Sequence, residues 1–181
     1  KLSITEKLEI AELSSGNEVF DLTSSQLQMY YLSKQGRRLE YQLPFLEKIP
    51  KFYQVQSIKR AVKKLVLKHP AFRTQFIEER GLPKQKILED FNIPTKIIEV
   101  SRGSLKEEIR GLCEIELKFP GPLVQGALLK IQDGDFDLLF LHLHHILSDA
   151  YSTNIMTEEF WEILTNPDQE VSQYDETYKL Y

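Results

Sequence analysis

The sequence predicts an α+β fold, an α/β sandwich in which helices cover a mixed sheet of about five strands. Helical and extended hydrophobic patterns alternate along its 181 residues, and the two most apolar extended segments are separated by a short polar turn. Hydrophobic residues make up 41% of the chain and charged residues 28%, which is typical of a globular chain that forms one domain.

The first helix is predicted over residues 24–35. Thr23 and Gln26 form a T-x-x-Q capping box at its start. Gly36 is placed to end it, because glycine adopts the backbone conformation that commonly closes a helix.

A strand and a second helix are expected next. The strand covers residues 39–45, and Pro44 indicates an edge position or an irregular end, because proline has no N–H to donate to a neighbouring strand. Pro70 ends the second helix. The apolar residues that recur at helical spacing in this helix are Val55, Ile58, Ala61, Val62, Leu65 and Val66.

A hairpin follows the second helix. Residues 74–78 and 85–88 are extended patterns joined across Gly81 and Pro83, both of which favour turns. A further strand is expected over residues 95–100.

The third helix is predicted to begin at Ser104, which forms a second capping box with Glu107. Gly121 and Pro122 are expected to stop it. Its apolar face would consist of Ile109, Leu112, Cys113 and Leu117.

The most apolar part of the chain is predicted to be a hairpin of two interior strands, over residues 123–131 and 136–143. Asp133, Gly134 and Asp135 separate the two strands. A last helix is expected over residues 152–164.

Composition argues against several classes of function. The net charge is -4 and both signs are mixed along the chain, so no positive face for nucleic acid is expected. No apolar stretch is long enough to span a membrane. Cys113 is the only cysteine and cannot form an internal disulfide, which favours a cytoplasmic location. Packing as a small apolar residue is the preferred interpretation of Cys113.

Three segments are expected along the chain. Residues 1–17 are interpreted as a leading strand or linker without an export signal. Residues 18–165 form the folded unit. Residues 166–181 are polar, include Pro167, and are interpreted as a linker that leaves this unit.

Polar side chains concentrate at the end of the last core strand, where His142, His144, His145 and Asp149 fall within eight residues. Because side chains alternate along a strand, His142 and His144 are expected on one face and His145 on the other. Packing alone would account for one histidine. Adjacent histidines where a rigid strand passes into a loop favour function, and a neutral imidazole can accept a proton near pH 7.

The carboxylate of Asp149 is predicted to need a basic partner or several hydrogen-bond donors, because a charge inside a core is otherwise costly. Arg73 is the candidate, in a structural pair that would hold the histidine loop in shape.

The segment from Leu143 to Ser152 reads L-H-H-I-L-S-D-A-Y-S and resembles the H-H-x-x-x-D-G signature of condensation domains of nonribosomal peptide synthetases. Residues 25–32 are similar to the family's S-x-A-Q-x-R-L-W-x-L motif, and residues 68–76 to its R-H-E-x-L-R-T-x-F motif. The histidine motif is shared with other chloramphenicol acetyltransferase-like acyltransferases, and three motifs in this order narrow the resemblance to condensation domains.

The resemblance implies a chloramphenicol acetyltransferase-like lobe over residues 18–165, an interlobe linker over 166–181, and a second lobe that is absent from this sequence. It also implies amide-bond formation between a donor acyl or peptidyl thioester and the amine of an acceptor aminoacyl thioester. His145 would be catalytic. Residues that would shape the motif are His144, Asp149, Arg73, Ala150 and Ser152.

The resemblance also implies partners. These are the second lobe, donor and acceptor carrier domains and a neighbouring adenylation domain, with no nucleic acid and no membrane. Both substrates would be carried on the phosphopantetheine of the carrier domains, and the lobe itself would bind no cofactor or metal.

The chain departs from the family motifs at four positions. Ala150 replaces the motif glycine, and its methyl group could narrow the tunnel or be incompatible with a positive-φ backbone. Lys68 and Pro70 replace an arginine and a glutamate, and Gln125 stands where many relatives carry arginine.

Three alternatives therefore accompany the condensation hypothesis. The first is a non-condensing relative, such as an epimerisation-type domain, another acyltransferase or a silent carrier-docking lobe. The second is a metal site built on His142 and His144. The third is a scaffold in which the histidines only fill the core.

Overall fold

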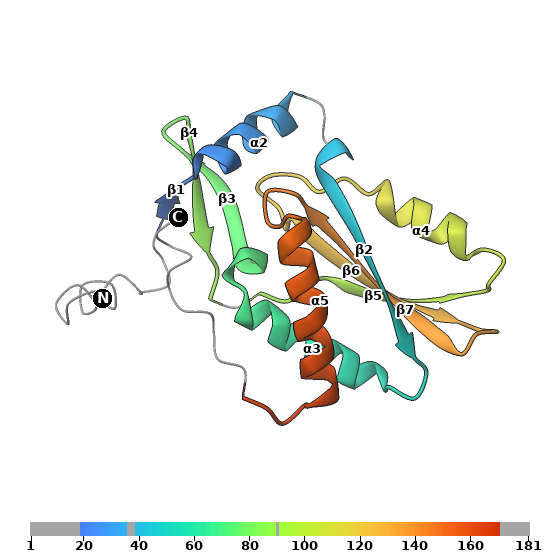
Figure 1. The fold of residues 1–181 in the computed structure, drawn as a ribbon. Helices are drawn as coiled ribbons and strands as arrows, with labels where there is room; N and C mark the ends of the chain where they lie inside the picture. The colour runs from blue at the N-terminus through green and yellow to red at the C-terminus, as the bar shows by residue number, and fades with distance from the viewer. Residues whose placement is uncertain (1–18, 36–38, 90, 171–181) are drawn as a thin grey trace.

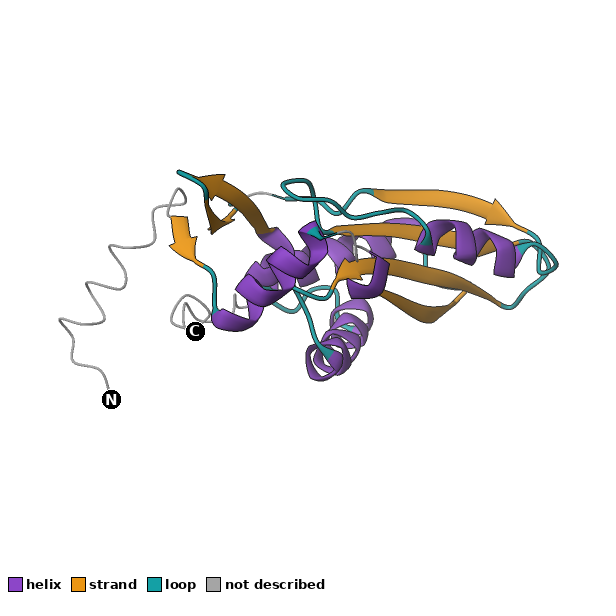
Figure 2. Cartoon of the chain, turned by 90° about the horizontal axis from the view of Figure 1, so that it is seen from above, coloured by secondary structure: helices purple, strands orange, loops and turns teal. Residues whose placement is uncertain are grey.

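The computed structural model describes residues 19–35, 39–89 and 91–170, and its strands form two sheets (Figure 1). The three-stranded sheet has the order β1-β4-β3 and the four-stranded sheet the order β2-β7-β6-β5. Figures 1 and 2 both show the three-stranded sheet at one end of the molecule, beside the longer strands of the other. The strands are β1 (Val19–Asp21), β2 (Gln42–Pro50), β3 (Thr74–Glu79), β4 (Leu82–Ile87), β5 (Thr95–Val100), β6 (Val124–Ile131) and β7 (Phe136–His144).

The four-stranded sheet is mixed, as the sequence predicts. Strand β7 pairs antiparallel with β2 on one side and with β6 on the other, and β5 pairs parallel with β6. Strand β2 is an edge strand, which is why it accommodates Pro44 and Pro50.

The sheet has four strands rather than the five expected. Strands β3 and β4 form the predicted hairpin, with positive φ at Arg80 and Gly81, but they pair with β1 instead of joining the larger sheet. Lys84, Gln85 and Lys86 make β4 too polar for a strand covered on both faces.

Helices cover both faces of the four-stranded sheet. Leu139, Leu141 and Leu143 of β7 pack in one apolar cluster with α3 (Val55–Lys68) and α5 (Ala150–Thr165). Leu138 and Phe140 pack in a second cluster with α4 (Leu105–Cys113). Because alternate residues of a strand point to opposite faces, β7 contributes to both layers of the core.

The first helix, α2 (Ser24–Lys34), confirms its predicted capping box. The Thr23 hydroxyl accepts from the N–H of Gln26, and the Gln26 side chain accepts from the N–H of Thr23. Gly36 lies outside the described residues, as do residues 1–17.

Two expectations for α4 are wrong. The Ser104 side chain makes no capping bond, because its Oγ lies 2.8 Å from Ser101 Oγ and serves the preceding turn instead. The helix also ends at Cys113 rather than extending to Leu117. Leu117 packs in the cluster on the other face of the sheet, and its N–H donates to Gln42 Oε1 at 3.1 Å.

The last helix, α5, begins at Ala150, two residues before its predicted start. Among the residues that the structure describes, no helix has the length and apolar character needed to cross a membrane.

Candidate functional site

The predicted histidine cluster lies at the turn that joins β7 to α5. The turn is closed by two backbone bonds, from Leu147 to His144 at 2.9 Å and from Ser148 to His145 at 3.3 Å. It is also tied to the residue before β2, because the N–H of His145 donates to the carbonyl of Tyr41 at 2.7 Å. A rigid strand and three backbone hydrogen bonds therefore set where the His145 side chain begins.

The His145 ring is half-buried and is held at one nitrogen only. Its Nδ1 lies 2.8 Å from the carbonyl oxygen of Ser148. A carbonyl can only accept, so Nδ1 carries the proton and Nε2 of the neutral ring keeps its lone pair. Within the described part of the chain, Nε2 has no hydrogen-bond partner. His145 can therefore accept a proton at Nε2 without breaking an existing bond.

His144 has the opposite tautomer. The N–H of Ile146 donates to His144 Nδ1 at 3.1 Å, so the proton of the neutral ring lies on Nε2, which donates to Ser33 Oγ at 3.0 Å. The ring is fully buried, and burial, followed by the electrostatic effect of the neighbouring His145, lowers the pKa of His144 to about 4. His144 is thus neutral at physiological pH.

His142 is buried as well and faces β6. Gln125 lies opposite His142 in the strand register, and its amide donates to His142 Nδ1 at 3.3 Å. Burial lowers the pKa of His142. The ring lies 5.8 Å from that of Phe140, on the face predicted from strand alternation. His145, by contrast, lies beyond the end of β7, so alternation does not decide its direction.

The arrangement does not support a metal site on His142 and His144. Both ring nitrogens of His144 are already hydrogen-bonded. No group of three or more potential ligands that could hold an ion occurs among the residues with described positions.

The prediction that Asp149 pairs with Arg73 is wrong. Asp149 is exposed at the N-cap of α5, where its Oδ1 accepts from the N–H of Ser152 at 2.8 Å and from the Ser152 hydroxyl at 2.7 Å. These bonds lower the pKa of the Asp149 carboxyl. The start of α5 supplies the hydrogen-bond donors for Asp149, so this carboxylate does not need Arg73 as a partner.

Arg73 is buried elsewhere, and its partners are all backbone carbonyls. It donates to Val66 at 3.2 Å, Leu67 at 3.5 Å and Leu88 at 2.6 Å. Two of these carbonyls belong to the last turn of α3, where a cation is favourable. Arg73 therefore joins the end of α3 to the segment after β4, and does not contact the histidine turn.

Ala150 is the first residue of α5, and its backbone is helical. Arg80 is the only non-glycine residue with positive φ in the described part of the chain, so the backbone at Ala150 does not require glycine. The expectation that alanine is incompatible with the backbone at this position is therefore wrong.

The sequence motifs did not predict Ser33 as the buried partner of His144. Ser33 and Tyr30 are the buried residues of α2, and a serine on the inner face of a helix was the available signal. It is weak, because such a hydroxyl can bond the preceding helical turn instead.

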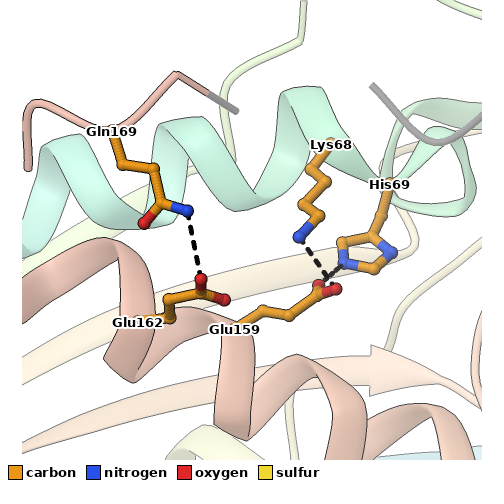
Figure 3. A network of polar contacts seen from close by, with 5 residues as sticks. All are labelled: Lys68, His69, Glu159, Glu162 and Gln169. Atoms are coloured by element: carbon orange, nitrogen blue, oxygen red, sulfur yellow. Dashed lines mark hydrogen bonds and ion pairs between the residues drawn. The ribbon is translucent and has the colours of Figure 1, made fainter. Parts of the chain in front are cut away.

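A second missed feature joins α5 to α3 and is drawn in Figure 3. Glu159 of α5 is buried, and its carboxylate pairs with Lys68 at 2.9 Å and with the Nε2 of His69. This network joins α5, the helix that follows the histidine turn, to the end of α3.

Comparisons with known proteins agree with this fold. The family model described as "Condensation domain" matches residues 17–181. Bacitracin synthase 3 of Bacillus licheniformis is 30% identical over 148 residues, which cover 81% of this chain and 2% of that protein. Bacitracin synthase 2 of the same organism is 30% identical over 166 residues, covering 91% and 6%. The chain thus spans a few per cent of the length of these relatives.

Solved structures show the same fold at low identity. The starter condensation domain of rhizomide synthetase superposes with a TM-score of 0.75 at 14% identity, covering 87% of this chain and 40% of that one. The first condensation domain of the calcium-dependent antibiotic synthetase gives 0.74 at 17%, covering 87% and 41%. The epimerization domain from the third module of tyrocidine synthetase B gives 0.69 at 21%, covering 89% and 39%.

Proposed function

The chain belongs to the condensation-domain family, and on that premise we propose that it supplies His145 as the proton acceptor in amide-bond formation between two carrier-borne substrates. The observation that carries the proposal is the single-sided hydrogen bonding of His145. Its Nδ1–H is fixed on Ser148, while Nε2 keeps its lone pair on a ring that is only half-buried. A general base needs such a nitrogen within reach of the proton it takes.

In the proposed reaction, the amine nitrogen of the acceptor aminoacyl group attacks the thioester carbonyl of the donor. The C–N bond forms, the C–S bond breaks, and the products are an amide and a thiol. His145 Nε2 takes a proton from the attacking nitrogen and returns one to the departing sulfur. The bond from Nδ1 to Ser148 stabilises the protonated ring, because a charged donor makes the stronger bond.

The remaining groups of the motif act on the turn rather than on the substrate. His144 holds the turn through Ile146, and Asp149 with Ser152 fixes the start of α5. Because the chain covers about two-fifths of the solved condensation domains it matches, we propose that a second lobe, joined through residues 166–181, supplies the rest of the tunnel. Residues 18–165 would be the first lobe, and residues 1–17 would precede it.

The proposed partners follow from this reaction. Donor and acceptor carrier domains would present both substrates on phosphopantetheine, with an adenylation domain nearby, in the cytoplasm. The alternative of a non-condensing relative loses part of its basis, because the backbone of Ala150 is helical.

Two substitutions of His145 test the proposal in the full-length protein with loaded carrier domains. In His145→Asn, the side-chain amide can take the place of Nδ1 and donate to Ser148, but the basic Nε2 is lost. His145→Ala removes both. We expect both variants to lose amide formation by roughly a hundredfold or more, the usual effect of removing a general base.

The two variants should differ in thermal stability. His145→Asn should unfold near the wild-type temperature, whereas His145→Ala should unfold lower because the turn loses a hydrogen bond. A His145→Asn protein that forms the amide at close to the wild-type rate would overturn the proposal.

A further inference from the structure

We infer that Ser33 of α2 is a positioning residue for His145, because its hydroxyl fixes the tautomer of His144 and through it the shape of the histidine turn. The inference rests on the proposed function of His145. Ser33 lies 111 residues from His144 in the sequence and outside the three motifs, and its side-chain hydrogen bond is to His144 rather than to His145.

The first step is the bond between Ser33 and His144. Both side chains are buried, and Ser33 Oγ lies 3.0 Å from His144 Nε2. The ring is also enclosed by aromatic neighbours, with Phe119 at 5.3 Å and Tyr41 at 6.5 Å between ring centroids. An N–H enclosed in this way is costly without an acceptor, so the hydroxyl stabilises the tautomer with the proton on Nε2.

The second step leads from His144 into the turn. With the proton on Nε2, Nδ1 is free to accept the N–H of Ile146 at 3.1 Å. The other tautomer would place two N–H groups against each other at this point. Loss of the Ser33 hydroxyl therefore weakens the bond that bends the chain directly after His145.

The third step reaches the proposed base. The turn that Ile146 enters also brings the carbonyl of Ser148 to within 2.8 Å of His145 Nδ1. This bond decides which nitrogen of His145 has the free lone pair. A series of hydrogen bonds, called here the relay, thus connects two adjacent histidines that have opposite tautomers. It begins at Ser33 and His144, continues through Ile146 into the turn, and ends at the bond between Ser148 and His145.

The substitutions that isolate the hydroxyl are Ser33→Thr and Ser33→Val. Threonine and valine have nearly the same shape, and only threonine keeps an acceptor. Ser33 lines a cavity of about 170 Å³ together with Lys34, Leu117, Lys118 and Phe119, so space for a larger side chain lies beside it. Any cost of a branched side chain in α2 is common to the two variants.

We expect Ser33→Thr to retain wild-type turnover, and Ser33→Val to lower kcat roughly three- to tenfold with little change in KM, the effect of one lost hydrogen bond in the relay. In histidine-labelled protein, the ¹⁵N shifts of the His144 ring should show the Nε2–H tautomer in wild type and Ser33→Thr, and a departure from it in Ser33→Val. If valine prevents folding, Ser33→Ala is compared with wild type by the same measurements and expectations.

Equal kcat and equal His144 ring shifts in the threonine and valine variants would overturn the inference. That result leaves the role of His145 intact, because His145→Asn tests it separately. Conversely, a tautomer change in Ser33→Val together with an active His145→Asn protein would show that Ser33 fixes the tautomer of His144 but that His145 is not the base.

Discussion

Asp149 and Ser152 form a closed pair at the start of α5, in which the backbone N–H and the hydroxyl of Ser152 both donate to one carboxylate oxygen, at 2.8 and 2.7 Å. The aspartate of the histidine motif is therefore a helix cap in this protein. We expect its effect on the site to be indirect, through the direction in which the chain leaves the turn.

The cap predicts different outcomes for two substitutions of Asp149. Asp149→Ala should lower the free energy of unfolding by about 1 kcal/mol, whereas Asp149→Asn should retain most of it, because asparagine caps helices equally well. Urea denaturation measures both. Equal losses in the two variants would show that the charge, and not the cap, stabilises the protein.

The sign of the pH effect follows from the same bonds. They lower the pKa of Asp149, so the stability it contributes is present above the pKa of the unfolded carboxyl and is lost as pH falls through the folded value. This acid dependence should be weaker in Asp149→Asn, which does not titrate.

The separation of Arg73 from Asp149 predicts additive effects. Arg73→Met removes bonds to backbone carbonyls at the end of α3 and should destabilise the protein by itself. Because the two residues share no partner, the coupling energy in a double-mutant cycle with Asp149→Asn should be below about 0.5 kcal/mol. A coupling well above that value would indicate the direct pair that the sequence had suggested.

Short-range patterns predicted this fold better than long-range pairings did. The capping box of Thr23 and Gln26 and the hairpin around Gly81 depend on residues a few positions apart, and both are present. The predicted capping box of Ser104 was wrong, because the Ser104 side chain bonds to Ser101 instead.

The site shows the same division. The position of His145 at the end of an interior strand could be predicted, because it follows from the apolar pattern of β7. Its tautomer could not, since it depends on the backbone of Ser148, and that of His144 depends on a serine in another helix. The predicted pair of Arg73 and Asp149 was wrong, because Arg73 donates to nearby backbone carbonyls and Asp149 accepts from nearby donors at the start of α5.

Burial of His144 predicts an acid-sensitive contribution to stability. Its pKa is lowered to about 4 from the ordinary value of 6.5, so the unfolded chain binds more protons between these values. The stability is therefore complete above pH 6.5 and is lost as pH falls toward 4, by about 3 kcal/mol at most.

His144→Asn is the matched variant for this effect, because its side-chain oxygen can still accept from Ile146 while the group no longer titrates. Urea denaturation between pH 4 and 7 should show a shallower pH dependence in the variant than in the wild type. The pKa of His142 is also lowered by burial, but His142 is present in both proteins, so its contribution to the pH dependence cancels in the comparison. Identical slopes would contradict the assignment of His144 as a neutral buried group.

The buried carboxylate of Glu159 predicts a loss that its exposed neighbour on the same helix should not share. Glu159→Gln removes the anion that Lys68 and His69 contact, and it should lower the free energy of unfolding by about 2 kcal/mol, the usual scale for hydrogen bonds to charged groups. Glu162 is exposed, and its side chain accepts from Gln169 at 3.1 Å (Figure 3), so Glu162→Gln should cost less than about 0.5 kcal/mol. Thermal and urea unfolding of the two variants provide the comparison. Equal stability of the two would mean that the contacts of Glu159 do not hold α5 against α3.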